Sequence, residues 1–100
     1  MKYVFDGIFN YKTSQKHIFE TSVAQIVDSV MEGFNGTVFA YGQTSSGKTH
    51  TMSGSDMYNE DERGVIPRMV THVFNKIHNS PSEIEFTVKV SMIEIYMEKI

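Results

Sequence analysis

Apolar residues recur at steps of three or four in two stretches of the chain, the spacing of one helix face. The first stretch predicts a helix over residues 14–33, with Thr13 or Ser14 as its N-cap and Gly33 near its end. The expected apolar face consists of Phe19, Val23, Ile26, Val27, Val30 and Phe34. We expect this face to pack against the rest of the fold.

The second stretch predicts a helix over residues 65–78. Pro67 falls in its first turn, where the missing N–H is tolerated, and Asn79-Ser80-Pro81 ends it. The apolar stripe consists of Ile66, Met69, Val70, Val73, Phe74 and Ile77. An acidic, glycine-containing segment precedes this helix, and we interpret residues 53–64 as a solvated loop.

Three other stretches have strand patterns. Residues 3–9 are rich in aromatic side chains, and residues 37–41 are largely apolar, as in a strand buried on both faces. Apolar and polar residues alternate over 84–92, and the phase then shifts, which indicates a strand over 84–96 with a bulge or burial on both faces. The alternation of strands and helices predicts an α/β fold with helices on both faces of a sheet.

A glycine-containing segment follows the apolar run at 37–41. Gly42-Gln43-Thr44-Ser45-Ser46-Gly47-Lys48-Thr49 matches G-x-x-x-x-G-K-[ST] at every fixed position. A buried-type strand before it and a helical start at Lys48 after it provide the context of a phosphate-binding loop. The alternative is an ordinary turn with a solvated lysine, which leaves the Lys48-Thr49 pair at the helix start unexplained. We therefore expect Gly42–Thr49 to bind the phosphates of ATP.

Each fixed position of this loop has a chemical reason. Glycine at positions 42 and 47 lets the backbone approach phosphate oxygens closely. The first N–H groups of the following helix are unpaired and lie at the positive end of its dipole. We expect Lys48 to act as the catalytic residue by placing its ammonium on the β- and γ-phosphates. The Thr49 hydroxyl is expected to ligate Mg²⁺.

Composition excludes several other classes of function. The chain has no cysteine, which removes disulfides, thiol catalysis and cysteine-based zinc sites. Its formal net charge is −3 and its tyrosines are not interleaved with basic residues, so we expect no nucleic-acid binding. No apolar run is long enough to cross a membrane and no signal-peptide pattern is present, so we expect a soluble intracellular protein without a membrane partner.

The residues around the loop resemble one family in particular. The segment from Asn35 to Met52, with Thr44-Ser45-Ser46 and His50-Thr51-Met52, closely resembles the phosphate-loop signature of kinesins, and conventional kinesin most of all. Three further stretches are similar to the same family: Phe5–Phe9, Gly64–Arg68 and Val90–Tyr96. The resemblance extends over residues 3–100, nearly the whole chain.

This resemblance implies an ATPase that moves along microtubules in the cytoplasm. It implies a phosphate-loop NTPase motor domain with a central mixed β-sheet flanked by helices, and ATP with Mg²⁺ as ligands. His50 occupies the position where the family places a residue against adenine. The loop at 53–64 corresponds to an insertion beside the nucleotide. A dimeric parent protein is compatible with the resemblance.

Several motifs of the family are absent from this chain. They are the adenine-contact motif Arg-x-Arg-Pro, the switch I motif Asn-x-x-Ser-Ser-Arg-Ser-His and the switch II motif Asp-Leu-Ala-Gly. The main microtubule-binding elements also lie outside it. We therefore expect a segment of a longer domain that hydrolyses ATP negligibly alone. A non-motile kinesin-like module and another phosphate-loop NTPase are the alternatives, and the switch motifs would distinguish motor from module.

Overall fold

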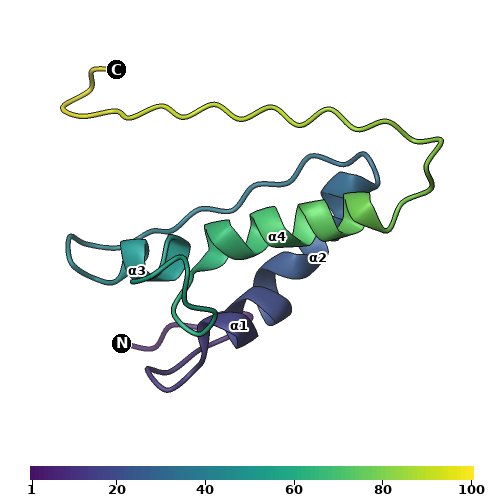
Figure 1. Cartoon of the computed structure of the whole chain (residues 1–100). Coiled ribbons are helices and arrows are strands. Elements are labelled where there is room, and N and C mark those ends of the chain that lie inside the picture. The colour runs from purple at the N-terminus through teal and green to yellow at the C-terminus, as the bar shows by residue number, and fades with distance from the viewer.

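The regular secondary structure of the chain is helical. The computed structural model describes all residues 1–100. In chain order the helical elements are α1 (Gln15–Ile18), the π-helical turn η1 (Phe19–Val23), α2 (Ala24–Met31), α3 (Lys48–Met52) and α4 (Val65–His78). α4 packs against η1 and α2, and the short α3 lies at the beginning of α4 (Figure 1). None of these helices has the length and apolar character that a membrane crossing requires.

The first helical stretch begins and ends at local capping interactions. The Ser14 side chain accepts a hydrogen bond from the His17 N–H at 3.1 Å, as an N-cap does. At the other end the Gly33 N–H donates to the Val30 carbonyl at 3.0 Å, and the Phe34 N–H donates to the Ser29 carbonyl at 3.1 Å. This pair of bonds closes the last turn. The helix therefore spans Gln15–Met31 in place of the expected 14–33, and Phe34 lies outside it.

A π-helical turn in the middle of this stretch changes which residues share a face. Ala24 N–H donates to the Phe19 carbonyl, five residues earlier, in place of the usual four. The buried residues Gln15, Phe19, Val23 and Val27 recur at steps of four. In a regular α-helix each such step overshoots a full turn by about 40°. The wider turn removes part of that drift, so all four side chains stay on the inner face.

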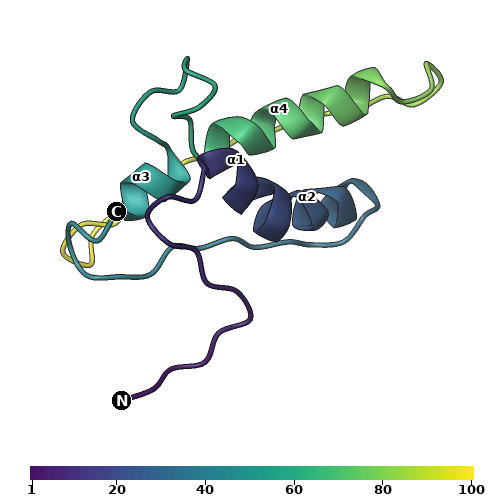
Figure 2. The ribbon, with the colours of Figure 1, turned by 90° about the horizontal axis from the view of Figure 1, so that it is seen from below.

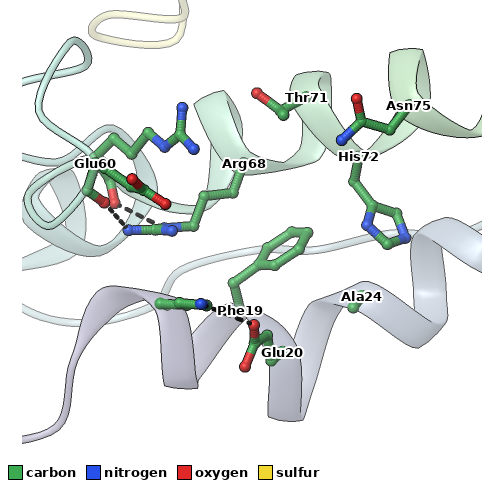
Figure 3. A pocket seen from close by; sticks show the side chains of 10 residues that line it. Phe19, Glu20, Ala24, Glu60, Arg68, Thr71, His72 and Asn75 are labelled. Atoms are coloured by element: carbon green, nitrogen blue, oxygen red, sulfur yellow. Dashed lines mark hydrogen bonds and ion pairs between the residues drawn. The ribbon is translucent and has the colours of Figure 1, made fainter.

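The hydrophobic core is small. It consists of Phe19, Val23, Val27 and Val65, with partly buried Ala24, Val38, Met52, Met69 and Val73 around it. Phe19 lies at its centre and meets the edge of the His72 ring at a centroid distance of 5.7 Å (Figure 3). Residues from η1, α2 and α4 therefore build one core between two crossing helices.

The apolar stripe expected on α4 is divided between two faces. Val65, Met69 and Val73 face the core. Ile66, Val70 and Phe74 are roughly half exposed instead, and so is Val30 of α2. A helix that is apolar over so wide an angle is suited to burial on both sides. Only one of the two sides is covered within this chain.

The three expected strands do not pair in this structure. Residues 3–9, 37–41 and 84–96 belong to no β-ladder, and the only β-bridges join Gly54 to Arg63 and Tyr96 to Lys99. A strand is completed by hydrogen bonds to a neighbouring strand, which local sequence cannot supply. Residues 81–100 are exposed throughout and run past the helices as an extended segment (Figures 1 and 2).

The extended segments leave much apolar surface uncovered. The accessible surface is 9131 Å², whereas a compact domain of this mass exposes about 5,800 Å². The radius of gyration is 15.7 Å, against about 13 Å for a compact domain of this length. The helical part thus has a core of its own, and the strand-like parts require further protein surface to be buried.

An ionic contact joins α2 to α4 at the surface. The Asp28 carboxylate accepts a hydrogen bond from His72 Nε2 at 2.7 Å and lies 3.3 Å from Lys76 Nζ. The bond to His72 is the main cause that lowers the pKa of Asp28; desolvation opposes it, and the bond and charge of Lys76 lower the pKa further. The carboxylate is therefore stabilised in its charged form by partners on the other helix.

This contact leads us to predict how the stability of the folded chain changes at acidic pH. Because the pKa of Asp28 is lower in the folded chain than its ordinary value of 3.8, the stabilisation is complete above that value and is lost as pH falls through the folded pKa. We expect Asp28→Asn to lower the melting temperature at about pH 6, and the difference from the unmodified chain to be smaller at about pH 3, below the ordinary pKa, where the stabilisation begins to be lost. Asp6→Asn, at an exposed position, is the control. An Asp28→Asn difference that is the same at both pH values would contradict the assignment.

Candidate functional site

The segment Gly42–Thr49 forms a tight loop between the extended residues 37–41 and α3. Ser46 N–H donates to the Gln43 carbonyl at 3.2 Å, which closes the turn, and Ser45 has a φ of 62°. Gly47 precedes the first residue of α3 with a φ of 104°. A side chain at position 47 would be strained in this conformation, so the second glycine of the motif is needed for the chain to enter α3 here.

At Gly42, the first glycine of the motif, a side chain from the opposite side of the loop comes close. A Cβ atom on Gly42 would lie 2.5 Å from the Ser46 Oγ. The absence of a Cβ on Gly42 therefore leaves room for the Ser46 side chain from the opposite side of the loop.

Most backbone N–H groups of the loop donate to no acceptor within the chain. Only Ser46 among residues 42–49 uses its N–H in an internal hydrogen bond. The unpaired donors include those of Thr44, Ser45, Gly47, Lys48 and Thr49. Consecutive unpaired N–H groups in a loop that includes residues of positive φ, as Ser45 and Gly47 are here, form a binding site for an anion. The loop thus has the donors that a phosphate group requires.

Lys48 lies across this loop. Its Nζ donates to the carbonyl of Gly42 at 2.5 Å and to that of Gln43 at 2.7 Å. No carboxylate forms an ion pair with it, because the ion pairs of the chain are Lys16–Glu20, His72–Asp28 and Lys76–Asp28. The positive charge is held at the loop by carbonyl dipoles alone, so it can interact with a bound anion.

Thr49 and His50 follow on α3 and are both exposed. His50 borders a cavity of about 440 Å³, which is also lined by Phe9, Tyr11, Ser46 and Gly47. Aromatic and small polar groups thus surround an open space next to the loop. The structure brings the predicted site residues Gly42, Gln43, Thr44, Ser45, Ser46, Gly47, Lys48, Thr49 and His50 together on one continuous surface.

The acidic segment after α3 is an ordered loop with a closed base. Gly54 and Arg63 pair in a β-bridge, and Gly64 N–H donates to the Ser53 carbonyl at 3.1 Å. The tip is exposed, as expected from its composition. This closed base sets the position of α4 directly after α3.

Arg68 is a structural residue whose role was not inferred from sequence. It is 6% exposed, and its guanidinium donates to the backbone carbonyls of Arg63, at 3.1 Å, and Glu60. Figure 3 shows it reaching from α4 toward the loop, beside Phe19. Its side chain therefore ties the acidic loop to α4. The available sequence signal was an arginine in the first turn of the helix, three residues after the apolar Val65.

Gln15 is the second residue that the sequence did not single out. It is 8% exposed, and its Nε2 donates to the carbonyl of His50 at 2.7 Å. The bond connects α1 to α3 across 35 positions of sequence. The available signal was its place four residues before Phe19, in phase with Val23 and Val27.

Comparison with known proteins identifies the family of this chain. The family model described as the kinesin motor domain matches residues 1–100. The chain is 57% identical to a kinesin heavy chain of Syncephalastrum racemosum over 96% of its length, and 49% identical to the kinesin-1 heavy chain of Homo sapiens over 98%. It spans about a tenth of the length of each of these relatives.

A solved structure gives the same result in three dimensions. The structure of a fast kinesin superposes with a TM-score of 0.80 at 46% identity, and the match covers 83% of this chain and 23% of the other. The sequence match and the structural match thus point to the same family. On these grounds the chain belongs to the kinesin motor-domain family.

Proposed function

We propose that this chain is the ATP-binding segment of a microtubule-based motor ATPase, which couples ATP hydrolysis to movement along microtubules. One observation carries the proposal: a row of unpaired backbone N–H groups lies in the same loop as a lysine ammonium that has no carboxylate partner. This combination suits a polyanion, and kinesin relatives support its identity as ATP.

The chain's own residues hold the triphosphate in this proposal. The N–H groups of Gly42–Thr49 donate to phosphate oxygens, and Lys48 exchanges a carbonyl partner for the β- and γ-phosphates. The Thr49 hydroxyl is exposed at the start of α3 and suits a hard cation that keeps most of its waters. Mg²⁺ bound there would neutralise charge that develops on the phosphates.

The adenine ring is proposed to lie against His50. This side chain borders the cavity of about 440 Å³ beside the loop, and Phe9 and Tyr11 offer aromatic surface on its other side. A flat heterocycle suits such a space because it can stack on aromatic groups. The nucleotide would then extend from the aromatic end of the cavity to the phosphate loop.

The extended segments are proposed to pair in the intact protein. Residues 37–41 and 84–96 would join a central mixed β-sheet flanked by helices, with partner strands that this chain does not contain. Their exposed apolar side chains and the uncovered face of α4 support burial of this kind. Microtubule contact would be made by other parts of the protein, in the cytoplasm.

Turnover measurements test this function. We expect the intact protein to hydrolyse Mg·ATP and to do so faster when microtubules are added. The 100-residue chain by itself is expected to hydrolyse ATP negligibly, because it has no switch motif to position the attacking water. Phosphate release in both samples, with and without microtubules, is the measurement. Turnover by the short chain at the rate of the intact protein would refute the second expectation, and no stimulation of the intact protein would refute the proposed function.

A further inference from the structure

We infer that Gln15 is a positioning residue for the phosphate loop, because its side-chain amide holds the carbonyl of His50 and so orients α3. The inference rests on the proposed function, since Lys48 and Thr49 act from the first turn of that helix. Gln15 itself touches no phosphate in this scheme. Its effect reaches the nucleotide through the backbone of α3.

The His50 carbonyl needs a partner from outside its own helix. α3 ends at Met52, and the N–H groups of both Ser53 and Gly54 donate to the Thr49 carbonyl, at 2.8 and 3.2 Å. No backbone N–H therefore reaches the His50 carbonyl. Carbonyl groups in the last turn of a helix commonly remain unpaired in this way and are completed by side chains or water.

Gln15 supplies that partner from a rigid position. The bond between its Nε2 and the His50 carbonyl is 2.7 Å long, and the side chain is almost fully buried. The residue opens α1 directly after the N-cap Ser14, in line with the core residues Phe19 and Val23. The amide is thus fixed to the part of the chain that has a hydrophobic core.

The other attachments of α3 lie at its C-terminal end. It is a helix of five residues with no fully buried side chain; Met52 packs partly against the core, and the closed base of the acidic loop follows at Ser53 and Gly54. Without the bond from Gln15, the turn that carries Lys48 and Thr49 could rotate or shift relative to α1. Gln15 and His50 also line the same cavity of about 440 Å³, so a change in their contact alters the walls of the proposed nucleotide site.

The test compares two neighbouring substitutions in the intact protein. Gln15→Asn keeps an amide but is one methylene too short to reach the His50 carbonyl. We expect the Kd for a fluorescent ATP analogue with Mg²⁺ to rise about tenfold, which corresponds to about 1.4 kcal/mol, the size of one internal hydrogen bond. Gln15→Met, which has similar length and no donor, should have the same effect. Ser14→Ala removes the N-cap of the same helix, so it should lower the melting temperature and leave Kd within twofold.

The outcomes separate positioning from general stability. If either Gln15 variant folds with a lowered melting temperature and an unchanged Kd, or if Ser14→Ala weakens binding equally, the inference is overturned. Because Gln15→Asn is the milder change, it remains informative where Gln15→Met does not fold. Failure of the unmodified protein to bind the analogue would overturn the proposed function instead.

Discussion

Replacement of Lys48 by alanine is expected to weaken ATP binding to the intact protein by about tenfold to a hundredfold, the largest functional effect of any single substitution in this chain. Charge-assisted hydrogen bonds contribute about 1.5–3 kcal/mol each, and every 1.4 kcal/mol is about a factor of ten in Kd. The Nζ of Lys48 already lies at the loop, 2.5 Å from the Gly42 carbonyl, with no carboxylate to neutralise it. Its removal leaves only the backbone donors for the phosphates.

Equilibrium binding of a fluorescent ATP analogue with Mg²⁺ measures this effect. Lys16→Ala is the matched control, because it removes the same charge from the exposed surface of α1, where the side chain is 64% exposed. We expect the control to bind with unchanged affinity. Lys48→Arg keeps the charge but places a larger, planar group in a loop that contacts the ammonium closely, so it should not restore binding. An affinity within twofold after Lys48→Ala means that the assigned role is wrong.

Replacement of Phe19 by alanine is expected to have the largest effect on the fold. Truncation of a buried phenylalanine lowers the free energy of unfolding by about 3–5 kcal/mol. Phe19 is 6% exposed at the centre of a core with only four buried hydrophobic residues, and it also contacts the edge of His72. Few side chains are near enough to fill the resulting cavity. We expect most of the cooperative unfolding of the helices to disappear.

Urea or thermal unfolding of the 100-residue chain, followed by its helical circular dichroism, is the measurement. Phe34→Ala provides the control, since it makes the same truncation where the ring is 66% exposed. It should change the unfolding free energy by less than about 1 kcal/mol. Similar losses from the two substitutions would show that Phe19 does not form the centre of the core.

The helices and the tight turn at Gly42–Thr49 could be predicted because their determinants are local. Ser14 caps the first helical stretch, Gly33 lies at its end, and α4 occupies Val65–His78, where the periodicity placed a helix. The loop Gly42–Thr49 has glycine at position 47, where φ is positive, and at position 42, where the Ser46 side chain comes close. Such requirements involve residues only a few positions apart, so they can be recognised from the local sequence.

The face of each helix was less predictable. The π-helical turn at Phe19–Val23 changed which side chains share a face, and Val30, expected on the inner side, is roughly half exposed; Phe34 is exposed because the helix ends at Met31 before it. A single additional residue in one turn alters the position of every later side chain on the helix. Periodicity counted with a constant step has no means of detecting that change.

The sequence pattern therefore predicted approximately where the helical stretches lie, and that a tight glycine-containing turn leads into α3. Only the tertiary structure decided that Gln15 holds the His50 carbonyl, that Arg68 secures the acidic loop, and that Asp28 meets His72 and Lys76. It also decided that residues 84–96 have no strand partner within this chain. The physical reason is the same in each case: a hydrogen bond or ion pair between residues distant in sequence depends on where the chain folds back, and an unpaired strand depends on a neighbour.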